Sequence, residues 1–200
     1  MLKGNRMSSG RRRMTLGLRR DLEWWLKFLP IIEGHSLLYE QQWLQADVLE
    51  LYTDASSWGA GAVYGNRWFL FAWTERYRQV ARREKRDSMP HYELLAVALA
   101  LSTWREYLRG KKVMLFSDCQ PVVAAVNKWN SRSQELMDVV RFLCWLCWEW
   151  KIVLKLRHIA TERNQLADPL SRNDLSLFKQ RCPSSNPEPD AVKEFQFHHF

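Results

Sequence analysis

The sequence predicts an α/β fold, in which a five-stranded mixed sheet has helices on both faces. Three short apolar runs separated by turn residues follow one another between residues 48 and 74, a pattern typical of antiparallel strands. After residue 90, runs of strand length alternate with longer runs that have helical spacing. Because a strand–helix–strand connection returns parallel to its start, the later strands should extend the sheet in parallel.

The expected elements follow one another in a definite order. Three strands come first, with Gly59, Gly61 and the Gly-Asn pair at 65–66 marking the turns. The polar, basic segment 75–90 is expected to be a connector. A helix, a strand, two helices, a strand and a final helix or turn then follow, at 91–108, 111–118, 120–129, 133–150, 151–158 and 164–172. The predicted order is therefore βββαβααβα.

Both ends of the chain differ in composition from its centre. Residues 1–20 hold seven Lys or Arg and no acid, which indicates a solvated arm, and 21–30 has the pattern of a short amphipathic helix ended by a proline. The core domain is expected to span 48–173, so that 1–47 forms a basic arm and helical connector. Residues 174–200 are rich in Pro and Ser and predict a linker or flexible tail.

Charge narrows the class of partner. The 30 Lys and Arg residues exceed the 22 Asp and Glu residues by eight, which favours a polyanion, either nucleic acid or an acidic membrane face. No apolar run approaches the ~20 residues that cross a bilayer, and the N-terminus lacks the apolar centre of a secretory signal. We therefore expect an intracellular, soluble protein without a membrane partner, in the cytoplasm or the nucleus. The four cysteines are too few for a disulfide framework, and Cys144 and Cys147 fit helix packing better than a zinc site.

Four acids stand out because the expected elements place one on each of four separate segments. Asp54 and Asp118 each end an apolar strand, and parallel strands that end in acids bring the carboxylates to one edge of the sheet. Glu93 lies on the apolar face of the first long helix, where an uncompensated charge would be costly. Asp168 follows the fifth strand, on the last short element. We expect the four acids to converge.

A cluster of carboxylates points to a bound cation. The charges repel one another, and a cation between them relieves that repulsion. Oxygen ligands without Cys or His suit Mg²⁺, with Mn²⁺ as a substitute, rather than zinc. Two such ions ~4 Å apart can bridge a scissile phosphate, one generating hydroxide and the other stabilising the leaving oxygen. The predicted metal ligands and catalytic residues are Asp54, Glu93, Asp118 and Asp168.

Several segments between residues 48 and 173 carry a resemblance to a known family. "YTDAS" with "GAGAV", "HYELLAVALAL", "LFSDCQPVVAAVNK" and "RHIATERNQLADPLSR" are similar to the ribonuclease H domain of retroelement reverse transcriptases. The four metal-binding acids of that family come in the order Asp, Glu, Asp, Asp, which matches the four acids above. Within the family, "NKWNSRSQELM" and "DLEWWLKFL" most resemble tyrosine-recombinase (DIRS-type) retrotransposons, and the ending of the last segment is also similar to hepadnavirus polymerases.

The resemblance implies a ribonuclease H-like fold and Mg²⁺-dependent endonucleolytic cleavage of the RNA strand of an RNA–DNA hybrid. Integrases and transposases of the same fold place their Glu last, whereas Glu93 comes between the first two Asp residues, which favours the nuclease branch. A reverse transcriptase polymerase domain is implied as a partner, in cis or in trans, with residues 1–47 corresponding to the tether. The chain has no Tyr-x-Asp-Asp polymerase motif of its own.

Contacts with nucleic acid are expected beside the acids. Basic residues gather between the third strand and the first long helix, where they can track the phosphates of a hybrid. Small polar side chains near the same edge can meet the minor groove or the backbone. The predicted nucleic-acid-binding residues are Ser56, Ser57, Arg82, Arg83, Arg86 and Asn127.

Some interpretations leave alternatives open. Asp168 precedes Pro169, so it can also be the N-cap of a helix with Pro at N1, or the cap can lie at Asn164. The loop with a catalytic His that many cellular members carry after the fifth strand is absent here, and His158 fits a structural role better than proton transfer. The rival for the whole domain is a catalytically silent nucleic-acid-binding or connection module of the same fold.

Overall fold

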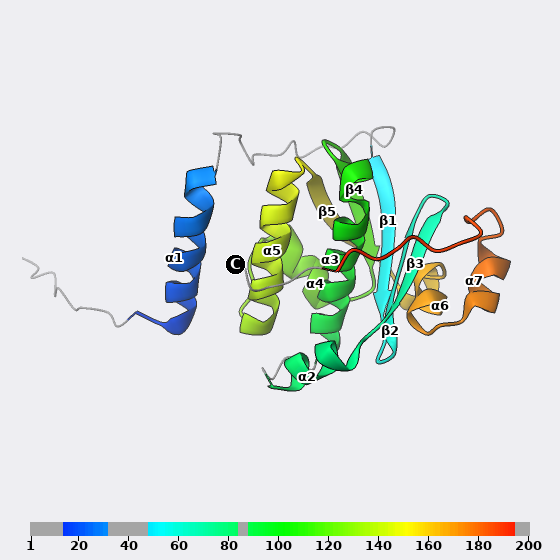
Figure 1. Cartoon of the computed structure of the whole chain (residues 1–200), viewed down its shortest axis with the longest axis horizontal. Helices are drawn as coiled ribbons and strands as arrows, with labels where there is room; N and C mark the ends of the chain where they lie inside the picture. Colours follow the sequence, from blue (N-terminus) through cyan, green and yellow to red (C-terminus); the bar gives the residue numbers. More distant parts are fainter. Residues whose placement is uncertain (1–13, 32–47, 84–87, 195–200) are drawn as a thin grey trace, which may run out of the picture. The chain divides into compact units, whose positions relative to one another are not determined.

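A mixed five-stranded sheet forms the centre of the computed structural model, which describes residues 14–31, 48–83 and 88–194 (Figure 1). The strand order is β3-β2-β1-β4-β5. The first three strands pair antiparallel, and β1, β4 and β5 pair in parallel, as the sequence predicts. The strands are β1 (Val48–Ala55), β2 (Gly59–Tyr64), β3 (Arg67–Ala72), β4 (Lys112–Ser117) and β5 (Val153–His158).

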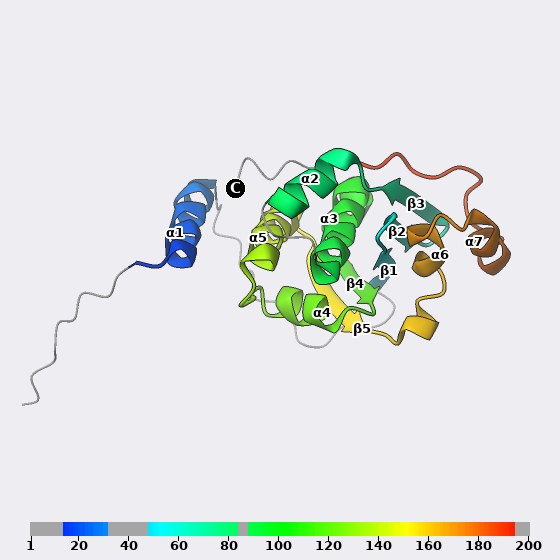
Figure 2. The same ribbon diagram turned by 90° about the horizontal axis from the view of Figure 1, so that it is seen from below.

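Helices cover both faces of this sheet. In Figures 1 and 2, α3 and α5 lie on one side of the strands and α6 and α7 on the other. The helices that follow β3 are α2 (Glu75–Arg83), α3 (Met89–Leu108), α4 (Gln120–Asn127), α5 (Gln134–Glu149), the short 3-10 turn η3 (Thr161–Arg163), α6 (Ala167–Ser171) and α7 (Leu175–Arg181). Among the described residues, no helix combines the length and apolar character needed to cross a bilayer.

The main core lies between the sheet and α3, α4 and α5. Nearly all side chains of α3 from His91 to Trp104 are buried, because its Ala, Leu and Val residues pack against the sheet on one side and α5 on the other. A smaller cluster on the opposite face joins β2 and β3 to α6 and α7. It consists of Val63, Trp68, Leu170 and Phe178.

The described residues 14–31 belong to a separate N-terminal unit. Its helix α1 (Leu16–Phe28) begins inside the segment expected to be a solvated arm and runs into the 3-10 turn η1 (Leu29–Ile31). The Thr15 hydroxyl accepts a hydrogen bond from the Leu18 amide and so caps the helix. The connector expected at 35–47 lies outside the described residues, and the boundary at residue 48 stays a prediction.

Helix α2 occupies a segment that the sequence analysis treats as a connector. Although its composition is polar, the helix is amphipathic. Ala81 is buried, and the Tyr77 ring packs edge-on against the Phe71 ring, with 5.6 Å between the ring centroids. Two inward-facing side chains among many charges are too weak a signal to separate a short helix from a loop.

The segment after residue 173 differs from the expected linker or flexible tail. Helix α7 buries Phe178 against Trp68, and the chain after it follows the edge strand β3. The amides of Asn186 and Asp190 donate to the carbonyls of Asn66 and Trp68, each at 2.8 Å. An edge strand offers unpaired backbone groups, so a segment of polar composition can be held there through its own backbone.

Candidate metal centre

Three acids meet at one edge of the sheet. Asp54 lies near the end of β1, and Asp118 directly follows β4. Because β1 and β4 are parallel neighbours, their ends reach the same edge. Glu93 enters from the first turns of α3, which packs on β1. One carboxylate oxygen from each of Asp54, Glu93 and Asp118 lies within 4.8 Å of the other two.

Burial makes the charges of two of these acids expensive. Burial, followed by the negative charges of Asp54 and Asp118, raises the pKa of Glu93 to about 9, and a hydrogen bond with the Ala55 backbone works in the opposite direction. Burial likewise raises the pKa of Asp54 to about 6, against a hydrogen bond from Ser171. Without a cation, one or more of these carboxyl groups therefore tends to stay protonated and uncharged.

The donor set fits a hard divalent cation. All three ligand atoms are carboxylate oxygens, which Mg²⁺ and Mn²⁺ prefer. The Oε2 atom of Glu93 is buried and has no hydrogen-bond partner. A bound cation would give that oxygen a partner and would compensate the clustered charges.

The fourth predicted acid, Asp168, lies outside the group of three. It sits in the first turn of α6, where its Oδ1 accepts a 2.7 Å hydrogen bond from Nε of Arg172. Its charge still helps to raise the pKa of Asp54, although burial is the main cause. The N-cap position of α6 is Leu166, which makes no side-chain capping bond, so neither Asp168 nor Asn164 is the N-cap. Pro169 is tolerated in the first turn, where amides lack helical partners.

Two neutral side chains that the sequence analysis does not single out hold Asp54. Nδ2 of Asn164 donates to Oδ1 of Asp54 at 3.2 Å, and the hydroxyl of Ser171 lies 2.5 Å from its Oδ2. Both side chains are fully buried. Both belong to the segment "NQLADPLSR", but their separation from Asp54 by more than 100 positions leaves no local pattern that marks the contact.

Two side chains predicted to bind nucleic acid, the buried Ser56 and the exposed Asn127, make hydrogen bonds to the protein's own backbone. The Ser56 hydroxyl donates to the Ser171 carbonyl at 2.6 Å and accepts from two backbone amides of the β1–β2 turn. The Asn127 amide group bonds both the amide and the carbonyl of Leu156 on the edge strand β5, each at 2.8 Å. Ser57 is exposed.

The predicted basic contacts lie partly outside the described residues. Arg82 is exposed on α2 and lies 3.8 Å from the Glu75 carboxylate. The side chain of Arg83 and the whole of Arg86 are not described. His158, at the end of β5, has Nε2 3.1 Å from the Asp118 carbonyl oxygen, which ties the loop carrying Asp118 to β5.

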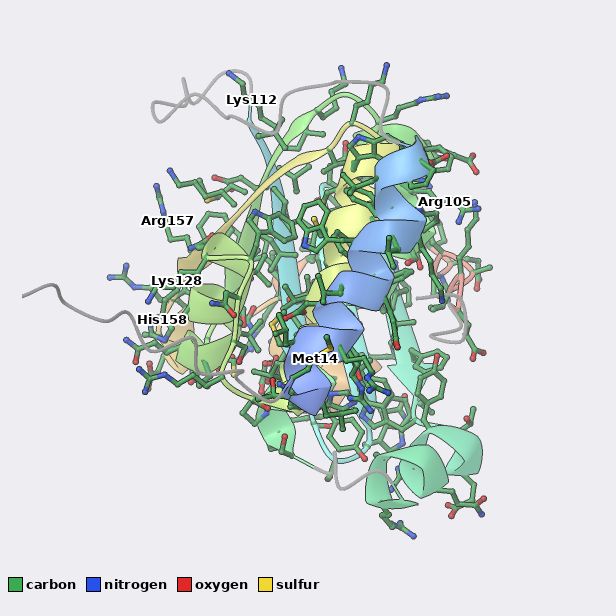
Figure 3. The ribbon with its side chains drawn as sticks, turned by 90° about the vertical axis from the view of Figure 1, so that its left-hand side faces the viewer. Met14, Arg105, Lys112, Lys128, Arg157 and His158 are labelled. Carbon is green, nitrogen blue, oxygen red and sulfur yellow. The ribbon has the colours of Figure 1, made fainter. Side chains whose placement is uncertain are left out.

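A cavity of about 530 Å³ lies beside α3, α4 and the start of α5. Its wall contains Lys128 and Arg132 together with small polar side chains such as Ser88 and Ser131. Figure 3 shows Lys128, Arg157 and His158 projecting outward on one side of the molecule, from the end of α4 and from β5. Lys128 and Arg157 are not among the residues that the sequence predicts to bind nucleic acid.

Three solved ribonuclease H structures are similar to the chain. RNase H1 (LC11) isolated from compost by a metagenomic approach is 17% identical, with 65% of this chain and 96% of that chain covered and a TM-score of 0.46. For RNase H1 of Halobacterium salinarum the identity is 16%, the coverage 64% and 98%, and the TM-score 0.47. For the N-terminal RNase H domain of a Mycobacterium tuberculosis protein, solved as a fusion with maltose-binding protein, these values are 14%, 63%, 95% and 0.43.

Sequence comparison identifies the family. None of the curated proteins is significantly similar in sequence to this chain. The family described as the RNase H-like domain found in reverse transcriptase matches residues 45–146, just over half of the chain. The matched residues include Asp54, Glu93 and Asp118 and end before Asp168. The chain therefore belongs to the family of RNase H-like domains found in reverse transcriptases.

Proposed function

We propose that this chain is a metal-dependent endonuclease that hydrolyses the RNA strand of RNA–DNA hybrids. The observation that carries the proposal is the group formed by the buried Asp54 and Glu93 and the half-buried Asp118, in which one oxygen from each acid lies within 4.8 Å of the other two. The pKa values of Asp54 and Glu93 are raised, and Oε2 of Glu93 has no hydrogen-bond partner. Such a cluster lowers the stability of the fold unless it binds a cation.

In the proposed mechanism these three carboxylates hold Mg²⁺, or Mn²⁺ in its place. When bound, such ions activate a water and stabilise the leaving oxygen of a phosphodiester. Asp168 is the fourth proposed ligand; its Oδ1 bonds Arg172, so its Oδ2 is the oxygen that would bind the metal. The role of the protein is to present fixed oxygens at the sheet edge, because the rigid ends of β1, β4 and α3 carry them.

The proposed hybrid lies across the edge that carries the acids. The remaining proposed contacts are Ser57, Arg82, Arg83 and Arg86. Ser56 and Asn127 are proposed contacts too, but their side chains already bond the protein backbone, which leaves them fewer free donors and acceptors for nucleic acid. Lys128 and Arg132 beside the cavity, and Arg157 on β5, add positive charge that suits a phosphate backbone.

The same proposal extends to the origin of the chain. We infer that the chain derives from a retrotransposon reverse transcriptase of the DIRS type, because two of its segments resemble that group. A polymerase domain in cis or in trans is the proposed partner, with residues 1–47 as the tether, because the family occurs in reverse transcriptases.

Cleavage of a labelled RNA–DNA hybrid tests the proposed activity. The full chain should release RNA fragments with Mg²⁺ and none with EDTA, and Asp118→Asn should abolish the product. Glu162→Gln, which changes an exposed acid that is not part of the group of three, is the matched control and should cut normally. The assay is run with and without an added polymerase domain. Undiminished cleavage by Asp118→Asn would reject the proposal.

One observation favours a second candidate, a silent nucleic-acid-binding module. Asp168 is paired with Arg172 and lies outside the group of three acids. If Asp168 stays outside that group when metal and substrate are bound, the fourth ligand is missing. This candidate predicts hybrid binding that weakens with salt but no metal-dependent product, with or without the polymerase domain.

A further inference from the structure

Helix α6 approaches the sheet where the sheet has no side chain. Gly61 on β2 is the direct partner of Asp54 on β1. A Cβ atom at Gly61 would lie 2.5 Å from Cβ of Leu170, and 2.6 Å from both the Ala167 carbonyl oxygen and the Ser171 amide nitrogen. Two of these three atoms belong to the backbone, so α6 could not keep its position above any larger residue.

This close approach brings Ser171 to the Asp54 carboxylate. The Ser171 hydroxyl lies 2.5 Å from Oδ2 of Asp54, in a site without solvent exposure at Ser171. Its oxygen also lies 2.9 Å from the Asp168 carbonyl. A hydroxyl has one proton, and a charged carboxylate is the stronger acceptor, so the proton goes to Asp54 whenever that group is ionised.

Ser171 is itself anchored to the strand that carries Asp54. The Ser56 hydroxyl donates to the Ser171 carbonyl at 2.6 Å, and Ser56 follows Asp54 by two positions. On the other side of the carboxylate, Asn164 bonds Oδ1 of Asp54 and the Thr53 carbonyl together. Both carboxylate oxygens are therefore held by buried, neutral donors from the C-terminal part of the domain.

We propose that Ser171 is a positioning residue, which α6 brings over Gly61 to hold the Asp54 carboxylate in the orientation that metal binding requires. This inference rests on the proposed function. A neutral donor fixes the direction of the remaining lone pairs without adding a positive charge that would compete with the cation. Arg172 does carry such a charge, and it is paired with Asp168 rather than with Asp54.

Binding of Mn²⁺ to the full chain, measured by calorimetry, tests the inference. Ser171→Ala should lower the affinity about 10- to 100-fold, the usual effect of removing a group that orients a ligand. When the hybrid concentration is varied, kcat of cleavage should fall while KM for the hybrid stays unchanged. Ser176→Ala, which changes an exposed serine on α7, is the matched control. It should leave the Mn²⁺ affinity and kcat equal to those of the unaltered chain.

Folding is measured on the same samples by circular dichroism and urea unfolding, so that affinities are compared only where each variant is fully folded. A purely structural serine would lower the unfolding midpoint and leave Mn²⁺ affinity intact. That result, or equal affinities for Ser171→Ala and Ser176→Ala, overturns the inference and leaves the proposed function standing. Failure of the unaltered chain to bind Mn²⁺ contradicts the proposed function and the inference with it.

Discussion

Glu93 brings a carboxylate into an otherwise apolar stretch of α3. Its pKa is raised to about 9, first by burial and then by the charges of Asp54 and Asp118. An oxygen of this group has no hydrogen-bond partner. Residues that make a fold less stable in this way are typical of functional sites, where the missing interaction comes from a ligand.

Replacing this carboxyl group with an amide should stabilise the metal-free protein. We expect Glu93→Gln to raise the free energy of unfolding in EDTA by about 1–3 kcal/mol at mildly alkaline pH. At that pH Glu93 is ionised in the unfolded chain and must take up a proton on folding, a cost that Gln does not have. The same change should abolish stabilisation by Mn²⁺. Urea unfolding measures both effects, with Glu162→Gln as a control that stays within about 0.5 kcal/mol of the unaltered chain. A less stable Glu93→Gln in EDTA would contradict this explanation.

The raised pKa values of Asp54 and Glu93 also predict a pH dependence. A carboxyl group with a raised pKa in the folded state binds its proton more tightly there than in the unfolded chain. The metal-free protein should therefore lose stability as pH rises through about 6, where Asp54 ionises, and on toward about 9, where Glu93 does. The Asp54 shift alone corresponds to at most about 3 kcal/mol.

Thermal unfolding between pH ~5 and ~9, with EDTA or with excess Mg²⁺, measures this dependence. Mg²⁺ should remove most of the loss, because it binds the ionised carboxylates of the folded state only. A midpoint that rises with pH in EDTA would show that the cluster does not dominate the titration in this range.

Among the elements, the segment after α7 shows how a short stretch of chain completes a fold. One backbone hydrogen bond joins it to Asn66, just before β3, and a second joins it to Trp68 in β3, which brings the Asp190 carboxylate against that strand. This carboxylate accepts hydrogen bonds from Nη1 of Arg67 at 3.1 Å and from Nε1 of Trp104 at 2.6 Å. Asp190 therefore links the edge strand to α3 on the main core.

Removing the Asp190 carboxylate should destabilise the domain. We expect Asp190→Ala to lower the free energy of unfolding by about 2 kcal/mol, because Trp104 is almost fully buried and its indole N–H would lose its acceptor. Glu188→Gln, an exposed acid two positions earlier, is the control and should change it by less than about 0.5 kcal/mol. Equal unfolding midpoints in urea for the two variants would show that this segment contributes little to stability.

For the whole molecule, the excess of eight positive charges predicts how nucleic-acid binding depends on salt. With about three phosphate contacts, affinity for a hybrid should fall roughly 30-fold between ~50 and ~200 mM monovalent salt. Lys128→Gln and Arg157→Gln should each lower the slope of log affinity against log salt by about 1 if these exposed residues contact phosphates. Fluorescence anisotropy with a labelled hybrid in Ca²⁺ measures the slopes. An unchanged slope in both variants would place the contacts elsewhere.

Most of the fold could be predicted because its signals are local. The order of strands and helices follows from apolar spacing and turn residues, and the mixed sheet follows from the order. Helix α2 could not be recognised, because one buried and one partly buried side chain are a weak signal among charges. The docking of residues 182–194 could not be predicted either, because it depends on the exposed edge of β3, which exists only after the sheet has formed.

The sequence alone determined which side chains could bind a hard cation and on which elements three of them lie, because acids at strand ends and on a helix face are visible as local patterns. Only the tertiary structure decided how these acids are held. Asn164 and Ser171 reach Asp54 across 110 and 117 positions, and Asp168 turns to Arg172 rather than to the group of three. These contacts depend on how closely α6 packs over Gly61, a distance set by the packed sheet and helix together and encoded in no single stretch of residues.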